Sequence, residues 1–452
     1  MDTRELGMHR TNDPSRRSFL GGAAAAAGAG LLLGMTGRAR GEVIQPPAGE
    51  AVKAKPRVAV KDGEPIRIGV IGLGGPGGCA MGRGHAEAFA EINKKEREKV
   101  VVAAVCDLNT LHLAAAKESV EKIQGSPVEA YTDHQKLLAR EDLHAVVAAV
   151  PEHWHAQMGI DCIAAGKDTY SEKPMTLNLA DAIRLHRAAQ ANPDLIFQVG
   201  TQAVNQPKYH EAKKLIAEGA IGMPTLSQTS YCRNSKDGEW HYTVNPAWKP
   251  GENLDWEKWC APLGSMPWDP KVYYQWRRYR KTSTGICGDL LVHVMTPMMM
   301  ALDQGWPTRV TAIGAHHSDK AMENHDNVTI LAQFETGHQM QVIGSTCNEA
   351  GLETMIRGHK GNIYLGGRHC VVRPERPFSE DVEERTIQCP DIGDDQDKHR
   401  LRWLHCIRSR EATWAPTELG LKVMVVVDLA TRSMWEGRSF EFDPKTMTAR
   451  AV

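Results

Sequence analysis

The sequence predicts an α/β protein that begins with a doubly wound parallel sheet and continues into a second domain rich in strands. Two observations predict the first domain. Short apolar runs alternate with helical segments from residue 66 to residue 171, and a glycine-rich turn follows the first run. A third observation predicts the second domain, because strand-like runs separated by turns follow one another from residue 225. With 452 residues, the chain is long enough for two domains.

The first forty residues resemble an export signal. Arg16 and Arg17 precede a weakly apolar stretch from Gly21 to Met35, and small residues follow it. This order is typical of a twin-arginine leader. The apolar stretch is about 15 residues, and a bilayer span takes roughly 20. We therefore expect residues 1–40 to direct export to the periplasm and the mature protein to have no stable membrane span. A flexible linker is expected over residues 41–62.

A dinucleotide-binding motif follows the first predicted strand, residues 66–71. Gly72, Gly74 and Gly77 fit the pattern G-x-G-x-x-G, and a helix is predicted over residues 81–92. Gly72 allows a tight turn, Gly74 lets the backbone approach a pyrophosphate, and Gly77 permits close packing of helix on strand. The N-terminus of the helix would receive the phosphate charge.

The next predicted strand, residues 100–106, ends at Asp107. A carboxylate at this place accepts hydrogen bonds from the ribose hydroxyls of adenosine. Leu108 and Asn109 follow, so no arginine is placed to bind a 2′-phosphate. The sequence therefore favours NAD over NADP.

The alternation of strands and helices continues to the end of the first domain. Helices are predicted over 111–123, 133–138 and 156–165, and strands over 128–131, 145–150 and 169–171. This pattern defines a Rossmann domain over residues 63–198, followed by a second domain over 199–452, which we expect to bind the substrate. Because ligands bind beyond the carboxyl ends of parallel strands, the segments 151–155 and 172–174 are expected at the site.

Five features, in this order, resemble the Gfo/Idh/MocA oxidoreductases. They are the glycine loop, Asp107, the turn at 151–155, the tripeptide Glu172-Lys173-Pro174, and the pattern Asp289-x-x-x-His293. The resemblance extends over nearly the whole chain after the leader. It implies a C-terminal domain with a large open, mainly antiparallel sheet, which would serve contacts in a homo-oligomer, a dimer or a tetramer.

The resemblance also implies roles for individual residues. Lys173 would reach both the substrate and the nicotinamide, with Glu172 beside it, and His293 would act as the catalytic acid or base. Pro151 and His155 would lie along the nicotinamide ribose.

These roles agree with the chemistry of alcohol oxidation. Loss of a hydride from carbon requires a base within hydrogen-bond reach of the hydroxyl, with its pKa near the working pH. Lys173 beside a positive nicotinamide ring and His293, which titrates near neutrality, both meet this requirement. Asp289 shares a helix face with His293 and would bind a sugar hydroxyl, hold the imidazole tautomer, or make only a structural contact.

Six tryptophans lie between residues 240 and 276. Aromatic faces stack on the apolar faces of sugar rings, although tryptophans serve as domain core or subunit interface just as readily. The candidate substrate residues of this region are Tyr231, Arg233, His241, Tyr242 and Trp276.

Composition excludes other classes of function. A formal net charge of −1 gives no global field for nucleic acid. The ten cysteines include no C-x-x-C pair, and the histidines form no H-E-x-x-H motif, so we expect no bound metal and mostly free thiols. The basic run 277–281 and the acidic run 391–398 are predicted to be solvated surface segments.

The second domain is predicted from its strand-like runs. Strands are expected over 225–232, 309–315, 327–334, 339–345, 354–357 and 362–365, with a hairpin turn at 335–338. Amphipathic helices are expected over 399–408 and 418–435.

The function expected from these observations is an NAD-dependent oxidoreductase for a sugar, glycoside or cyclitol. An exported enzyme has no free nicotinamide pool, so the cofactor would be held tightly and regenerated in place. One alternative is a redox-neutral glycosidase, lyase or epimerase that works through a transient keto-sugar. A second alternative is a non-catalytic sugar-binding protein.

Overall fold

The computed structural model describes residues 43–44, 52–74 and 81–452. The predicted leader, Gly77 and part of the predicted linker lie outside these residues. Within the described part, no helix is both long enough and apolar enough to cross a bilayer.

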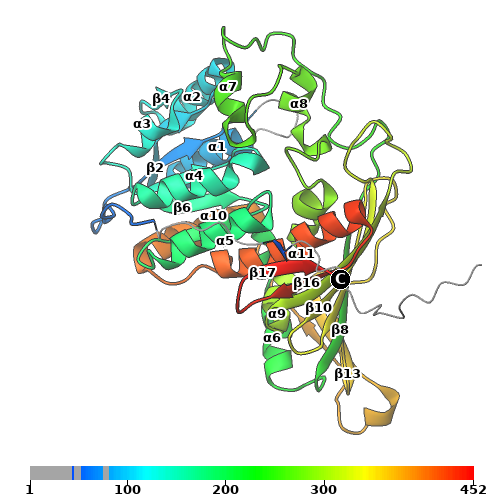
Figure 1. Cartoon of the computed structure of the whole chain (residues 1–452). Coiled ribbons are helices and arrows are strands. Elements are labelled where there is room, and N and C mark those ends of the chain that lie inside the picture. The colour runs from blue at the N-terminus through cyan, green and yellow to red at the C-terminus, as the bar shows by residue number, and fades with distance from the viewer. Residues whose placement is uncertain (1–42, 45–51, 75–80) are drawn as a thin grey trace, which may run out of the picture. The chain divides into compact units, whose positions relative to one another are not determined.

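The first domain contains a six-stranded parallel sheet, which confirms the predicted doubly wound sheet (Figure 1). In spatial order its strands are β4 (Glu129–Tyr131), β3 (Val100–Cys106), β2 (Ile66–Ile71), β5 (Ala145–Ala148), β6 (Asp168–Glu172) and β7 (Phe197–Gly200). The strand order reverses between β2 and β5. That switch point is where an open α/β sheet binds its ligand.

Helices cover both faces of this sheet. They are α1 (Met81–Lys94), α2 (Thr110–Gln124), α3 (His134–Leu138), α4 (Glu152–Ala164) and α5 (Leu179–Gln190). Side chains of Asn109 and Asp133 cap the N-termini of α2 and α3. The interpretation of residues 151–155 as a turn is wrong, because α4 begins at Glu152. Pro151 precedes that helix at φ −63°, a value that suits a helix start.

Part of the linker predicted to be flexible makes fixed contacts. The amide of Ala54 donates to Asn192 Oδ1 (2.9 Å), and Asn192 Nδ2 donates to the carbonyl of Val52 (2.7 Å). The amide of Lys55 donates to the carbonyl of Ala164 at the end of α4 (2.9 Å).

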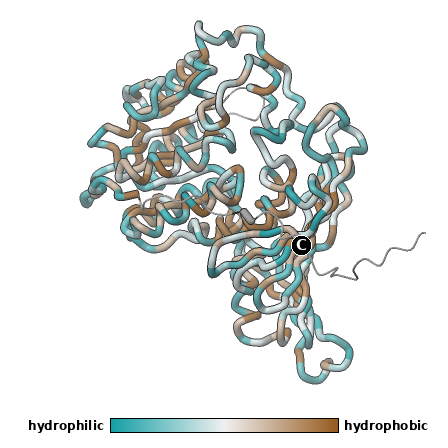
Figure 2. Tube along the Cα trace, viewed as in Figure 1, coloured by the Kyte–Doolittle hydropathy of each residue, from teal (hydrophilic) through white to brown (hydrophobic). Residues whose placement is uncertain are grey.

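A helix from the end of the chain completes the core of the first domain. Helix α10 (Asp395–Ser409) inserts Trp403, Leu404 and Ile407 among the buried residues of β2, β3 and α1. Figure 2 shows hydrophobic stretches, in brown, along the helices and strands of the molecule. The acidic run 391–398 is a largely exposed loop, as predicted, only up to Asp394; its second half is the first turn of α10, which Asp394 caps.

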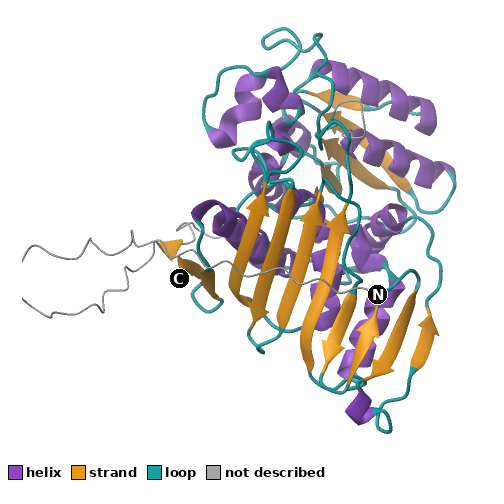
Figure 3. Cartoon of the chain, turned by 90° about the vertical axis from the view of Figure 1, so that its right-hand side faces the viewer, coloured by secondary structure: helices purple, strands orange, loops and turns teal. Residues whose placement is uncertain are grey.

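The second domain contains an eleven-stranded sheet among the described residues, which confirms the predicted large, mainly antiparallel sheet (Figure 3). In spatial order its strands are β1 (Val43–Ile44), β17 (Thr448–Ala451), β16 (Phe440–Asp443), β9 (Pro307–Ala315), β10 (Asn327–Phe334), β11 (Gln339–Ser345), β8 (Pro224–Cys232), β12 (Met355–Gly358), β13 (Gly361–Tyr364), β14 (His369–Pro374) and β15 (Arg385–Gln388). Only β8 and β11 pair in parallel.

Three helices pack behind the face seen in Figure 3: α6 (Pro207–Ala217), α9 (Val292–Leu302) and α11 (Thr417–Glu436). Side chains alternate along the strands, so Val328, Ile330 and Ala332 of β10 are buried against the helices. On the opposite face Ile313 is 75% exposed and Leu331 is 54% exposed. This face of the sheet is open.

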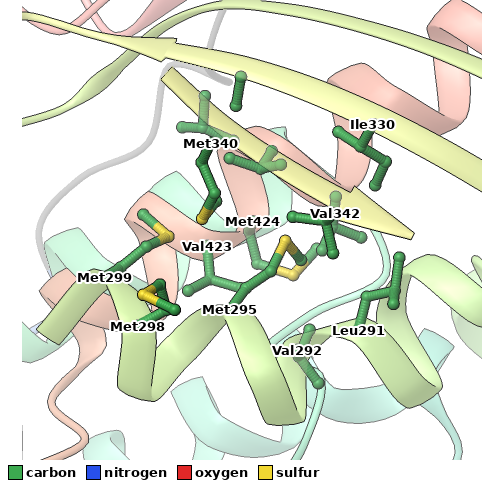
Figure 4. Packing of buried hydrophobic residues seen from close by; sticks show 14 of the residues in the cluster. Leu291, Val292, Met295, Met298, Met299, Ile330, Met340, Val342, Val423 and Met424 are labelled. Carbon is green, nitrogen blue, oxygen red and sulfur yellow. The ribbon is translucent and has the colours of Figure 1, made fainter. Parts of the chain in front are cut away.

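Helix α9 is held rigidly between the sheet and α11. Met295 and Met298 are fully buried, together with Met340 and Val342 of β11 and Met424 of α11. Figure 4 shows these side chains pointing into the space between the helix and the strand. Because a close-packed interior resists displacement, this packing fixes the N-terminal end of α9 relative to the sheet.

Candidate active site

A cavity of about 610 Å³ lies beyond the carboxyl ends of β2, β3, β5 and β6. It is lined by most of the residues that the sequence places at a site. From the first domain these are Gly72, Gly74, Asp107, Pro151, Glu172 and Lys173, and from the second they are Arg233, Tyr242, Trp276, Asp289 and His293. The location therefore agrees with the rule for strand ends.

The backbone of the glycine loop approaches neighbouring backbone closely at two glycines. Gly72 has φ +82°, and a Cβ there would lie 2.7 Å from the carbonyl oxygen of Ala149. A Cβ on Gly82 of α1 would lie 1.9 Å from the carbonyl oxygen of Gly72. Gly82 thus allows α1 to approach the loop closely at this point.

Asp107 lies directly after β3 and organises the same loop. Its carboxylate accepts hydrogen bonds from the amides of Leu73 (2.7 Å) and Asn109 (2.7 Å). Burial raises the pKa of this carboxyl group from its ordinary value.

The residues around this end of the cavity fit a nicotinamide dinucleotide. Gly72 makes the tight turn next to Ala149 that only glycine allows, and Asp107 presents a carboxylate where ribose hydroxyls would lie. Beside it, His112 Nε2 is buried and has no hydrogen-bond partner among the described residues. Gly72 and Gly74 would hold the pyrophosphate, Asp107 the adenosine ribose, and Pro151 and Lys173 the nicotinamide end.

Lys173, which precedes a cis proline, contacts Asp289 at the other end of the cavity. Its Nζ donates to the carbonyl oxygen of Asp289 (2.7 Å) and to Asp289 Oδ1 (2.8 Å). Arg277 Nε donates to the same Oδ1 (2.8 Å). Burial raises the pKa of Asp289, but the charges of Arg277 and Lys173 outweigh burial and hold the pKa far below its ordinary value. Asp289 is therefore a carboxylate that positions two cations.

Asp289 lies in a single turn of π-helix, Cys287–Leu291, that precedes α9. Such turns are frequent at functional sites. Its carbonyl oxygen and its side chain both contact Lys173, so the turn places two acceptors around one ammonium group.

A buried network holds Glu172 next to Lys173. Arg400 Nε donates to His85 Nδ1 (3.0 Å), so His85 carries its proton on Nε2 and donates it to Glu172 Oε1 (2.7 Å). Burial opposes ionisation of Glu172, but the hydrogen bond from His85 and the charge of Lys173 lower its pKa to about 2. Glu172 is therefore a carboxylate held in place from the side away from the cavity.

His293, in the first turn of α9, faces the cavity as a neutral base. Burial and then the charge of Lys173 lower its pKa to about 3. Its ring makes no hydrogen bond within the described part of the chain, and the nearest aromatic ring, Tyr231, is 6.1 Å away between centroids. The expectation that His293 titrates near neutrality is therefore wrong, because burial and the charge of Lys173 disfavour the imidazolium; the ring is neutral and keeps a nitrogen lone pair that can accept a proton.

Glu152 supports the site without lining the cavity, and the sequence predicts no role for it. Its fully buried carboxyl accepts hydrogen bonds from Ser283 Oγ (2.6 Å), the Thr284 amide (3.0 Å) and Thr284 Oγ1 (3.2 Å). Burial raises its pKa to about 7. Glu152 thus ties α4 to the loop that leads into the π-helical turn of Asp289.

Three predicted site residues do not line the cavity. The buried ring of His155 lies within hydrogen-bond distance of the carbonyls of Val150 (2.7 Å) and Pro174 (2.5 Å), so it joins the two loops after β5 and β6. His241 is exposed and contacts the carbonyl of Asp237. Tyr231 is not part of the cavity wall, and its ring centroid lies 6.1 Å from that of His293.

The basic run 277–281 is solvated, as the sequence predicts, only at Arg280 and Lys281. Arg278 is 5% exposed and pairs with Asp319 (2.5 Å), whereas Arg277 reaches Asp289 and its guanidinium lies 4.1 Å from the ring centre of Trp276. Ion pairs with residues from elsewhere in the chain account for this burial.

In the part of the chain that the structure describes, no three His, Cys, Asp or Glu side chains gather as a metal-binding group. The nine cysteines of that part are free, as predicted.

Comparison with known proteins identifies two family models in the chain. Residues 66–201 match the NAD-binding Rossmann fold of the Gfo/Idh/MocA oxidoreductase family, and residues 264–442 match the C-terminal alpha/beta domain of that family. The cofactor class is therefore a nicotinamide dinucleotide.

Individual relatives are similar to only part of the chain. Inositol 2-dehydrogenase from Rhodococcus erythropolis is 30% identical over 167 residues, which are 37% of this chain and 44% of the relative. A glycosyl hydrolase family 109 protein from Shewanella baltica is 31% identical over 175 residues, 37% of this chain and 35% of the relative. The chain thus spans less than half the length of these two curated relatives.

Solved structures show the same fold. Levoglucosan dehydrogenase in complex with NADH and L-sorbose superposes with a TM-score of 0.62 at 19% identity, over 83% of this chain and 98% of that one. The two family models together extend from the first strand of the dinucleotide-binding sheet to the strands near the end of the chain. The chain belongs to the Gfo/Idh/MocA oxidoreductase family.

Proposed function

We propose that the protein is an NAD-dependent oxidoreductase that acts on a carbinol carbon of a sugar, glycoside or cyclitol. One observation carries the proposal. The ammonium of Lys173 and the neutral imidazole of His293 line one end of a cavity whose other end contains Gly72, Gly74 and Asp107.

The side chains support a division of roles in alcohol oxidation. A bound nicotinamide would supply the hydride acceptor. Lys173 has three N–H donors and uses two on Asp289, so one remains for the substrate hydroxyl. That hydrogen bond would orient the hydroxyl and stabilise the developing alkoxide. His293, which is neutral at physiological pH, would accept the hydroxyl proton. Its pKa of about 3 makes it a weak base, so the transfer depends on Lys173 stabilising the alkoxide as the hydride leaves.

The substrate class rests on the walls of the cavity near these groups. Trp240, Tyr242 and Trp276 offer aromatic faces, and Arg233 offers donors that suit hydroxyl groups. Two similar proteins act on polyols according to their names, inositol 2-dehydrogenase and levoglucosan dehydrogenase. These observations favour a cyclic polyol.

A redox-neutral reaction is the second candidate. One similar protein is named a glycosyl hydrolase family 109 protein. In this reaction a hydroxyl would be oxidised as NAD takes its hydride, and the acidified neighbouring C–H would lose a proton to a base as the leaving group departs. In a hydrolysis, water would then add to the resulting double bond, and the hydride would return to the keto group. Such an enzyme needs no external nicotinamide, which suits an exported protein.

A panel of free sugars, cyclitols and aryl glycosides tests both candidates on the mature protein loaded with NAD. A lasting rise in absorbance near 340 nm, the band of reduced nicotinamide, supports a net dehydrogenase. Aglycone release without net reduction supports the redox-neutral enzyme. Saturable binding of a sugar with neither signal would contradict both and support a sugar-binding protein.

Export to the periplasm is part of the proposal. It rests on Arg16, Arg17 and the apolar stretch that follows them. We expect replacement of both arginines by lysine to keep the full-length chain in the cytoplasm, whereas the unchanged chain reaches the periplasm. Cell fractionation measures the difference, and equal distribution of the two chains would contradict the assignment.

Self-association is also part of the proposal. The exposed side chains of Ile313 and Leu331 on the open face of the large sheet support a homo-oligomer that buries this face. Light scattering on the mature protein and on a Leu331→Lys variant would measure the assembly directly.

A further inference from the structure

A segment of the second domain folds over the dinucleotide end of the cavity. We name residues 240–276 the tryptophan cap; it contains α7 (Trp256–Cys260) and α8 (Pro270–Tyr274). Its aromatic side chains form a small hydrophobic core of their own, with Trp248, Trp256, Trp259, Tyr273 and Tyr274 all buried. In Figure 1, α7 lies beside α2 of the first domain.

The cap is tied to the loop that follows β3. The amide of Thr110 donates to the carbonyl of Asn253 (2.9 Å), and the amide of Asp255 donates to the carbonyl of Leu108 (3.1 Å). Asn109 Nδ2 donates to the hydroxyl of Tyr273 (3.2 Å). This loop begins at Asp107, so the cap is anchored next to the carboxylate that would bind the ribose.

A second set of ties joins the cap to α4. The carbonyl of Trp259 accepts hydrogen bonds from His153 Nε2 and from Trp154 Nε1, both at 2.9 Å. The rings of His153 and Trp259 also meet edge to face, with centroids 4.4 Å apart. The cap is therefore fixed on two sides of the cavity.

Cap residues form part of the cavity wall opposite the first domain. Lys258, Trp259, Tyr273 and Tyr274 line the same cavity as Asp107 and Asp133. A ligand bound at Asp107 would lie between these two walls.

His112 of α2 links the cap to the nucleotide site. Its ring lies against the ring of Trp248 (5.3 Å, 81°) and parallel to the ring of Tyr273 (6.5 Å, 10°), and its Nδ1 is 3.9 Å from Asp107 Oδ1. Its other nitrogen, Nε2, is buried beside the cavity without a partner among the described residues. Because a buried polar atom without a partner is unfavourable, a ligand hydroxyl or ring nitrogen would satisfy it.

We propose that the tryptophan cap completes the adenosine side of the nucleotide site, with His112 and Tyr273 in contact with the adenosine, and that the cap must open before the nucleotide can leave. The inference rests on the proposed function. Release then requires the contacts to the β3 loop and to α4 to break together, so the dissociation rate is set by opening of the cap. An enzyme that keeps its nucleotide in this way can work where none is free in solution.

The rate of nucleotide release from the mature protein tests the inference. The protein is loaded with NADH, mixed with excess NAD, and followed by the energy transfer from tryptophan to bound NADH. Trp248→Ala truncates a cap side chain that does not line the cavity, and Tyr273→Phe removes only the hydroxyl that Asn109 contacts. Trp414→Ala truncates an exposed tryptophan elsewhere and is the matched control.

We expect the unchanged protein and Trp414→Ala to keep NADH through gel filtration, with release over hours. Trp248→Ala should release it at least tenfold faster and Tyr273→Phe severalfold faster. Equal release rates for Trp248→Ala, Tyr273→Phe and the unchanged protein, or release within seconds from the unchanged protein, would overturn the inference while leaving the proposed function intact. Failure of the unchanged protein to bind NADH would instead contradict the proposed function.

Discussion

Replacement of Lys173 by methionine should lower kcat by about 10²–10⁴-fold while NAD stays bound. Methionine keeps most of the side-chain volume but removes the ammonium that lies between Asp289 and the cavity. The substrate hydroxyl then loses its donor, and the alkoxide loses its nearest positive charge. Initial rates with the best substrate of the panel, together with the nucleotide released by acid, measure both parts of the prediction.

Lys281→Met is a suitable control for this variant. Lys281 is an exposed lysine in the same region of the chain, so its replacement should leave both quantities unchanged. Full activity in Lys173→Met would remove Lys173 from the mechanism. Loss of NAD together with activity would assign it to cofactor binding alone.

Replacement of His293 by alanine should lower kcat by a similar factor, about 10²–10⁴-fold, and added imidazole should restore part of it. The expected pH dependence is specific. A base must be unprotonated to act, and the pKa of His293 is lowered to about 3 by burial and by Lys173. The rate of the unchanged enzyme should therefore show no loss attributable to His293 between pH 8 and pH 5.

The pH profile of kcat/KM, measured for the unchanged enzyme and for His293→Ala, tests this directly. His405→Ala, which truncates an exposed histidine, serves as the control. A loss of rate with an apparent pKa near 6.5 that vanishes in His293→Ala would contradict a neutral, buried imidazole. Rescue by imidazole would still identify the ring as the base.

Much of the fold is predictable from the sequence because burial imposes patterns on it. Strands β3, β10 and β11 end at the residues predicted, since each is a run of side chains with a clear pattern of burial. Asp133 was identified as a helix cap from its chemistry alone. The start of α4 was missed because Pro151 suits a turn and a helix start equally well.

The position of the candidate site was also predictable, because it depends on where parallel strands end. Asp107, Pro151 and Lys173 follow three such ends and line one cavity. Asp289 and His293 come from the second domain, and the resemblance to a known family places them there. Their spacing alone fits a structural pair equally well.

The partners of these residues were not predictable, because they meet only through the tertiary fold. Glu152 and Ser283 are 131 residues apart, and Asn109 and Tyr273 are 164 apart. The sequence around Arg277 predicts a solvated run, and only the fold brings this residue to Asp289. The sequence leaves open whether the tryptophans bind sugar or form a core, and several form the core of the cap. Side chains that support or close a site leave no local pattern in the sequence.

The central claim is that a nicotinamide dinucleotide occupies the cavity between Asp107 and His293, with its ring beside Lys173. A crystal structure of the mature protein with NADH tests this most directly. The account predicts the adenosine ribose at Asp107 and the nicotinamide next to both Lys173 and His293. A protein that binds no NADH at millimolar concentration, or that binds it with Lys173 and His293 remote from the ring, would contradict the account.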